Sequence, residues 1–428
     1  MRNVILTDGF RTPFAKAGTA LAEVPARELG RIAVTELLAR HGVDPAEVDE
    51  VIFGNVGQPS DSTNIARVIA LFSGIPERVP AVTVQRNCAS GMEAILQAQE
   101  RIAAGHADLI VAGGTESMSQ IPLYLSKGMT RVFERLSRAK SVGERVGAIT
   151  AARPKDLQPR VAILEGLTDP VSGLNMGQTA ELLAKEFGIS REAQDDFALR
   201  SHRLAVAATE EGRLPEEIVP VFAQPYQTPV LVDVGPRKNQ SLEALAKLRP
   251  YFDPKNGTVT PGNSCGITDG AAAILVASEE KARAIGLTPA GRIRGSAMVG
   301  LDPARMGLGP TYAAPIALRR AGLRFQDMKL LEINEAFAAQ VIANEIAMAS
   351  AKYGREKLGL DGAVGQIDRS ILNVNGGAIA LGHPVGVSGA RIVLTMLREM
   401  RRRDVSLGLA MLCVGGGQGG AVVLERAA

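Results

Sequence analysis

The chain has 428 residues, which is enough for two or three packed domains. Its 46% hydrophobic and 22% charged residues are typical of a globular protein, and a net charge of +3 gives no reason to expect nucleic-acid binding. Three cysteines without a CxxC pair argue against a disulfide framework and against a zinc site. No signal-peptide pattern and no membrane-spanning apolar run is recognisable, so we expect a cytoplasmic protein.

The first part of the chain alternates between strand-like and helix-like patterns. Runs rich in Val and Ile indicate strands, and apolar residues recurring every three or four positions indicate helices. The expected strands are 4–8, 48–56, 81–85 and 107–114, and the expected helices are 28–42 and 88–105. Strand, helix and strand at these spacings predict βαβ units and an α/β architecture.

Residues 120–257 break this rhythm and are interpreted as an inserted loop domain with helices at 178–187 and 190–212. Within the insertion, 127–160 carries nine Lys or Arg residues against three acidic ones, interleaved with apolar side chains. A solvated helical hairpin is one interpretation. The other is a docking surface, spanning about 121–160, for a partner subunit, an anionic membrane or CoA phosphates.

The end of the chain repeats the plan of the beginning. The expected elements are a strand at 371–375, a glycine-rich turn at 376–389, a helix at 388–402 and a strand at 407–417. Ser90-Gly91 and Ser388-Gly389 stand at equivalent helix starts, which suggests an internal duplication. The expected domains are 1–119 with 258–280, the insertion 120–257, and 281–428.

Two residues in turns of small residues form the first candidate pair. Cys88 follows an expected strand and opens a helix, where the helix dipole is expected to lower the thiol pKa. A lone cysteine at such a turn is more often structural, so a nucleophile here needs a base. His383 lies among glycines ahead of another helix, unlike His41, His106 and His202, which we expect to be structural or exposed.

Two further turns each hold one polar residue. Cys413 ends a strand and precedes a glycine cluster that matches a dinucleotide fingerprint, but the following segment is a strand and not a helix, so that interpretation is rejected. A tight hairpin with backbone N–H groups free to hold an oxyanion, such as that of Gly415, fits better. Asn334 follows the strand 328–333 and begins a helix, which a plain N-cap would also explain.

The motifs RNCASGMEAI, NEAFAAQ, NVNGGAIALGHPVGVSGAR and CVGGGQG, in this order, resemble those of the thiolase family. The resemblance covers essentially the whole chain and looks closest to the thiolase β subunits of fatty-acid oxidation complexes. It implies duplicated βαβαβαββ halves that form a layered α-β-α-β-α core, with an inserted loop domain. It also implies acyl transfer between CoA thioesters, either cleavage of a 3-ketoacyl-CoA or the reverse Claisen condensation.

The resemblance assigns a role to each candidate. Cys88 matches the acylated cysteine, His383 the acceptor of its proton, and Cys413 the acid/base thiol. One oxyanion hole is implied at His383 with a water held by Asn334, and another at the backbone N–H groups of Cys88 and Gly415. CoA is implied as a substrate, with no metal and no permanently bound cofactor.

CoA contacts are implied less directly. Residues aligned with the nucleotide end, the pantetheine and the thioester pocket are Arg237, Ser241, Lys247, Ser264, Cys265, Met176 and Phe337. Two departures from the family pattern bear on chain-length preference. Cys265 stands where many members have serine, and Asn175 stands where short-chain members have histidine.

Two other functions fit these motifs less well. A condensing enzyme for malonyl thioesters would lack the Cys413 motif, and a non-catalytic lipid carrier or scaffold would have lost reactive residues. The resemblance further implies a homodimer or homotetramer, and it leaves open a hydratase/dehydrogenase partner subunit.

Overall fold

The amino-terminal half of the chain builds one side of a mixed sheet. The computed structural model describes residues 2–223 and 228–427. The elements of this half are β1 (Val4–Leu6), α1 (Ala26–His41), β4 (Glu50–Gly54), α2 (Ile65–Phe72), β5 (Ala81–Val84), α3 (Ser90–Ala103), β6 (Leu109–Glu116) and β9 (Thr268–Ser278). The strands lie in the order β5-β4-β6-β9-β1, and short strands β2 (Phe10–Arg11) and β3 (Ala15–Lys16) pair with β9. The expected elements are confirmed within a few residues.

The carboxy-terminal half continues the sheet as β11-β12-β13-β10, joined to β1 through the pair Leu6 and Gly291. After a short α10 (Glu279–Ala284), its elements are β10 (Gly291–Gly300), α11 (Gly309–Ala321), β11 (Leu330–Ile333), α12 (Ala338–Ala349), α13 (Ala351–Leu358), α14 (Ala378–Leu381), α15 (Ser388–Arg402), β12 (Leu407–Val414) and β13 (Gln418–Arg426).

The prediction of a regular strand at 371–375 is wrong. The segment makes a single parallel bridge, Leu331 to Leu372, beside β11. Asn373 has a φ of 45°, which is incompatible with extended backbone and stops the pairing there. The segment nevertheless occupies the place beside β11 that β5 occupies beside β4. With it, the two halves have the same strand order, as expected of a duplication.

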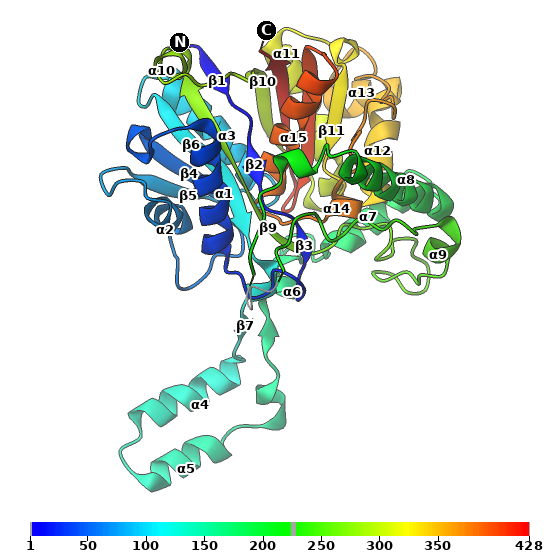
Figure 1. The fold of residues 1–428 in the computed structure, drawn as a ribbon. Helices are drawn as coiled ribbons and strands as arrows, with labels where there is room; N and C mark the ends of the chain where they lie inside the picture. Colours follow the sequence, from blue (N-terminus) through cyan, green and yellow to red (C-terminus); the bar gives the residue numbers. More distant parts are fainter. Residues whose placement is uncertain (1, 224–227, 428) are drawn as a thin grey trace.

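Helices and sheet form five layers (Figure 1). One hydrophobic cluster lies between α1, α2 and the amino-terminal strands, and another lies between α11, α12 and the carboxy-terminal strands. A third fills the centre, where α3 and α15 pack against each other between the two halves. This α-β-α-β-α order confirms the fold class expected from the sequence.

The central helices touch backbone to backbone at their amino-terminal ends. A Cβ atom built on Gly91 would lie 2.8 Å from the backbone nitrogen of Ala390. One built on Gly389 would lie 2.6 Å from the backbone nitrogen of Met92. The duplicated Ser-Gly pairs therefore allow an approach that a side chain would prevent. The turns that precede the two helices are held together as a consequence.

The insertion consists of a packed part and a projecting part. Its packed helices are α7 (Met176–Glu186), α8 (Arg191–Glu210) and α9 (Leu242–Ala246), and α7 and α8 contact α12. The short α6 (Ala162–Gly166) has no buried residue. The remainder is an arm of β7 (Leu123–Tyr124), α4 (Lys127–Arg138), α5 (Val142–Thr150) and β8 (Arg160–Val161), which extends away from the body (Figure 1). The domain boundaries given above stay a prediction. Among the described residues, no helix has the length and apolar composition to cross a membrane.

Replacing Gly389 by alanine tests the contact between the central helices. The added methyl group would lie 2.6 Å from a backbone nitrogen that cannot move without its helix, so we expect a loss of about 1–3 kcal/mol of unfolding free energy. Gly143→Ala on α5 is the control, since its Cβ meets nothing within 4 Å. Denaturant unfolding measures both, and equal stability of the two variants would contradict the contact.

Candidate active site

The turn that carries Cys88 connects β5 to α3. Asn87 has a φ of 43°, a left-handed conformation that asparagine tolerates better than most residues. The buried Ser90 hydroxyl accepts the backbone N–H of Arg86 at 2.8 Å and donates to the carbonyl of Asn87 at 2.7 Å. Because α3 begins only at Ser90, Cys88 lies in this fixed turn and not on the helix.

Asn87 also joins two of the candidate turns. Its side-chain amide donates to the carbonyl oxygen of Gly415 at 2.8 Å, which binds the Cys88 turn to the hairpin after Cys413. Asn87 was not among the residues expected from the sequence. The available signal was an asparagine directly before a candidate nucleophile, in a place where a left-handed turn residue is common.

The Cys88 thiol has a raised pKa. Burial is the main cause, and the negative charge of Glu116 adds to it. Hydrogen bonds from the backbone N–H groups of Gly415 and Cys88 itself oppose the rise without cancelling it. The expected lowering by the helix dipole is therefore wrong, since desolvation outweighs it. The same two N–H groups are those expected to form an oxyanion hole.

His383 is held by its own turn. Its backbone N–H donates to the carbonyl of Gly266 at 3.0 Å, and its Nδ1 lies 2.6 Å from the Ser388 hydroxyl. That hydroxyl donates to the carbonyl of Pro384 at 3.3 Å, so it accepts from Nδ1–H. Nε2 then carries a lone pair. Ser388 thus orders the turn before α15 as Ser90 orders the turn before α3.

The imidazole of His383 is neutral and has a free acceptor. Burial, with a smaller contribution from Arg391, lowers its pKa to about 4. Within the described residues, Nε2 is buried and has no hydrogen-bond partner. A buried lone pair of this kind is costly, and it is typical of an atom whose partner is a substrate or a solvent molecule.

Asn334 has the same property. The helix after it begins at Ala338 and is capped by Phe337, so the N-cap explanation for Asn334 is wrong. Its backbone N–H donates to the carbonyl of Met411 at 3.0 Å, while both polar atoms of its side chain are buried without a partner in the described part of the chain. The amide is therefore available to a group that does not belong to this chain.

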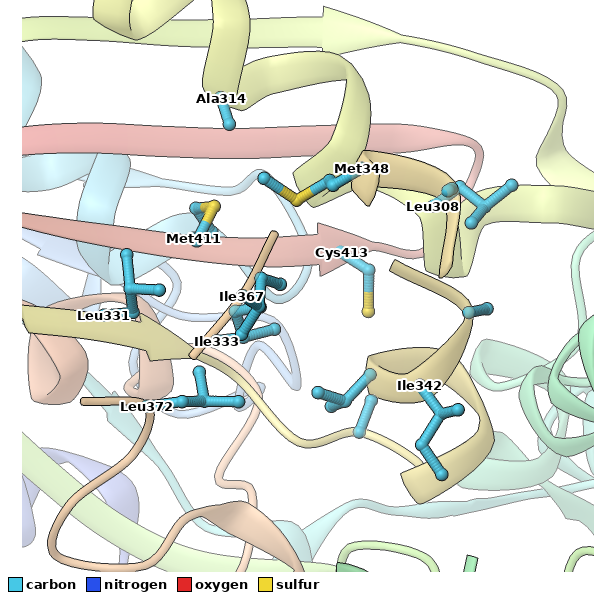
Figure 2. Close-up of a cluster of buried hydrophobic side chains, with 14 of the residues drawn as sticks. Leu308, Ala314, Leu331, Ile333, Ile342, Met348, Ile367, Leu372, Met411 and Cys413 are labelled. Carbon is cyan, nitrogen blue, oxygen red and sulfur yellow. The ribbon is translucent and has the colours of Figure 1, made fainter. Parts of the chain in front are cut away.

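Cys413 lies near the end of β12 with its sulfur among apolar side chains of α12 and its surroundings (Figure 2). Burial raises its pKa well above the ordinary value, and Cys88 and Cys265 add to the shift. Burial likewise raises the pKa of Cys265 to about 12, with Cys88 as the next cause. These mutual charge effects place the three thiols in one region.

Further expected residues lie around the thiols. Ser264 forms an isolated antiparallel β-bridge with Phe337, and the backbone N–H of Cys265 donates to the carbonyl of Ala336 at 3.0 Å. The sulfur of Met176 lies 3.3 Å from where a Cβ on Gly415 would stand. Met176 therefore lies beside the hairpin after Cys413, whereas Ser264 and Cys265 lie along the segment that leads into α12.

The residues expected at the nucleotide end of CoA lie around α8 and α9. Arg237 lines a surface pocket between α8 and the loop before α9, and its backbone N–H donates to Nδ1 of the buried His202 at 3.2 Å. Ser241 caps α9, and Lys247 follows that helix. No hydrogen bond or ion pair in the described residues connects these three to the thiols. The described residues also contain no group of three His, Cys, Asp or Glu that could hold a metal ion.

Comparisons with known proteins match almost the whole chain. The thiolase amino-terminal domain model matches residues 4–280, and the thiolase carboxy-terminal domain model matches 287–426. A 3-ketoacyl-CoA thiolase of Yersinia pestis (strain Pestoides F) is 44% identical over 423 residues, covering 99% of this chain and 96% of that protein.

Solved structures give the same result. The Bacillus anthracis acetyl-CoA acetyltransferase has a TM-score of 0.86 and 39% identity, covering 100% of this chain and 99% of that one. Human mitochondrial 3-ketoacyl-CoA thiolase in complex with CoA has a TM-score of 0.86 and 37% identity, covering 100% and 98%. Since both domain models match in order over almost the whole length, the chain belongs to the thiolase family and is an acyltransferase.

Proposed function

We propose that this enzyme cleaves a 3-ketoacyl-CoA with CoA, yielding acetyl-CoA and an acyl-CoA shortened by two carbons. The names of the Yersinia relative and of the human structure with CoA support this substrate class. The observation that carries the proposal is a set of buried polar atoms without partners in the described chain, Nε2 of His383 and the amide of Asn334, in turns that adjoin those of the thiols. CoA acts as a substrate, and no permanently bound cofactor is needed.

In the first half-reaction, Cys88 gives its proton to Nε2 of His383 and attacks the 3-keto carbon. The bond between C2 and C3 breaks, and its electron pair passes to C2 of the departing acetyl-CoA. Cys413 supplies the proton for that carbon. The acyl group remains on Cys88 as a thioester.

In the second half-reaction, the thiol of CoA gives its proton to the Cys413 thiolate left by the first step and attacks the acyl carbon. The departing Cys88 sulfur takes back a proton from protonated His383. Negative charge develops on a thioester oxygen at this step. We assign the hydrogen bonds that stabilise it to the backbone N–H groups of Cys88 and Gly415, which also lower the pKa of the Cys88 thiol in part. In the first half-reaction, protonated His383 and a water held by Asn334 donate hydrogen bonds to the oxygen of the acetyl-CoA enolate. The same residues run the reverse condensation.

The nucleotide end of CoA is assigned to the basic surface near α9. Arg237 lines a pocket there together with Arg203 and Lys238, and Ser241 and Lys247 lie at the two ends of the helix. Guanidinium and ammonium groups suit phosphate groups. Ser264, Cys265, Met176 and Phe337 line the path of the pantetheine and the thioester. We further infer a cytoplasmic homodimer or homotetramer.

Mass spectrometry tests the covalent step. After incubation with acetoacetyl-CoA and rapid acid quench, we expect an acetyl adduct on the Cys88 peptide, and we expect Cys88→Ser to lack it. Cys265→Ser is the matched control and keeps the adduct, because that thiol is not proposed to carry the acyl group. An adduct on Cys265 or Cys413 alone would contradict the assignment.

The pH dependence of alkylation tests the electrostatics. Because burial raises the pKa of Cys88 while His383 stays neutral, iodoacetamide should label Cys88 with a rate that climbs with pH and an apparent pKa above the ordinary thiol value of 9.0. Peptide mapping assigns the label to Cys88. A rate that is already at its plateau at neutral pH would reveal a thiolate–imidazolium pair and contradict this picture.

We also propose that the arm formed by residues 121–161 docks on an anionic membrane surface. Of its residues, only Val132, Ala148 and Asp156 are buried, and none belongs to a hydrophobic cluster. On α5, Val142, Val146 and Ile149 follow one helical stripe and are 53–77% exposed. Such a hairpin buries too little apolar surface to be stable alone, which favours an external surface that covers it.

Charge favours a lipid surface over a second copy of the chain. The segment 127–160 has nine basic residues and three acidic ones, and apolar side chains flanked by Lys and Arg are typical of helices that lie at membrane interfaces. Exposed α4 residues Arg131, Arg135 and Arg138 carry part of this charge. Two copies of the arm would repel each other.

Co-sedimentation with vesicles tests the arm. The triple variant Arg131→Glu, Arg135→Glu and Arg138→Glu should weaken binding to phosphatidylglycerol vesicles by about 100-fold or more, at roughly 1 kcal/mol per basic residue. The control makes the same change in charge on α13, at Lys352, Arg355 and Lys357, which are also exposed. Binding that is equal for neutral and anionic vesicles, or capture of a hydratase/dehydrogenase subunit in place of lipid, would contradict the proposal.

A further inference from the structure

Glu116 is a buried carboxylate with no role in the steps above. It is the last residue of β6 and is 1% exposed. Its Oε1 accepts the backbone N–H of Gly57 at 2.8 Å and the side-chain amide of Asn55 at 3.0 Å. Its Oε2 accepts the backbone N–H groups of Val56 at 3.1 Å and of Gly386 at 2.9 Å. No ion pair to Glu116 occurs among the described residues.

The bond to Gly386 differs from the other three because it crosses between the halves of the molecule. Gly386 lies in the turn between His383 and α15, whereas Glu116 and its other donors belong to the amino-terminal half. The turn lies directly on the ends of two strands. A Cβ on Gly386 would be 2.8 Å from Oε2 of Glu116, and a Cβ on Gly114 would be 2.1 Å from the carbonyl oxygen of Gly386.

The carboxylate also acts on the nucleophile, since its charge is one cause of the raised pKa of Cys88. Glu116 is thus coupled to both partners of the proposed proton transfer. Its hydrogen bond to Gly386 holds the backbone of the turn that carries His383, and its negative charge raises the pKa of Cys88 without a direct contact. Four N–H donors surround it, so a neutral carboxyl would have its O–H among donors and would lose part of this anchor.

Resting on the function proposed above, we propose that Glu116 is a positioning residue for the thiolase reaction. Its ionised carboxylate fixes the His383 turn of one half onto the strand ends of the other, so that imidazole and thiol face each other. The inference stands on the four hydrogen bonds and on the contact between the halves. A buried charge held by N–H donors in this way is strongly oriented.

The titratable groups nearest to Glu116 include Asp269 on β9 and Cys88 before α3, which are coupled to it by charge, and His383, whose turn it binds at Gly386. Burial raises the pKa of Glu116 to about 7, and the charge of Asp269 contributes to the rise. As pH falls through this value the carboxyl becomes neutral and the anchor weakens. His383, with a pKa of about 4, does not titrate in this range. The acylation rate should therefore decrease on the acid side of neutrality.

Glu116→Gln is the decisive variant. It preserves shape but places an NH₂ group against N–H donors, so we expect kcat to fall by about 10- to 100-fold, with KM for CoA nearly unchanged. The acid-side decrease in the acylation rate should disappear, which a merely structural residue would not cause. Glu116→Asp, which retains the charge, should recover part of kcat. The control is Glu50→Gln, which neutralises a carboxylate at the first residue of β4, whereas the turn lies at the other end of that strand, against Gly54. This variant should behave as wild type.

Each alternative outcome is informative. Wild-type kcat and an unchanged pH profile in Glu116→Gln would overturn the inference. If that variant does not fold, stopped-flow acylation of the wild type decides, because a rate that is flat from about pH 5.5 to 8.5 would overturn it equally. A wild-type enzyme that forms no Cys88 adduct would instead refute the proposed function, which distinguishes the two failures.

Discussion

Contact between the amino-terminal ends of α3 and α15 determines where the candidate turns can lie. Gly91 and Gly389 let the two helices meet backbone to backbone, with separations that a methyl group would prevent. Cys88 precedes the first residue of one of these helices by two positions, and His383 precedes that of the other by five. The two residues are nearly 300 positions apart along the chain, so this approach is what brings a thiol and an imidazole from different halves to one place.

A second consequence of this packing is a set of reactive groups held in their neutral forms. Burial raises the pKa of Cys88 and Cys413 and lowers that of His383. In the proposed mechanism, charge therefore develops only when the substrate is in place and the backbone N–H groups can accept it. Nε2 of His383 and the amide of Asn334 have no hydrogen-bond partner among the described residues, and leaving these buried groups unpaired costs stability.

Local patterns in the sequence predict the elements and the duplication well. Strand-like runs and helical periodicity locate β4, α3, β6 and α15 within a few residues, and the paired Ser-Gly steps mark the central helices. The interpretation of 371–375 as a strand fails because one asparagine adopts a positive φ, which apolar patterning does not reveal.

The candidate site is predictable only in part. The residues that precede or follow glycine-rich turns stand out, and so Cys88, His383 and Cys413 could be selected. The direction of the Cys88 pKa shift could not, since the helix dipole is a local feature whereas desolvation depends on the whole fold. Asn87 and Glu116 were missed for a related reason, because their partners lie in distant parts of the chain.

The most direct test of the account is a crystal structure of the enzyme cooled after reaction with acetyl-CoA. We expect an acetyl group on the Cys88 sulfur, with its carbonyl oxygen within hydrogen-bond distance of the backbone N–H groups of Cys88 and Gly415. Nε2 of His383 and the sulfur of Cys413 should both face that group. An acetyl group whose oxygen points away from Gly415, or a His383 ring that lies outside the cavity, would contradict it.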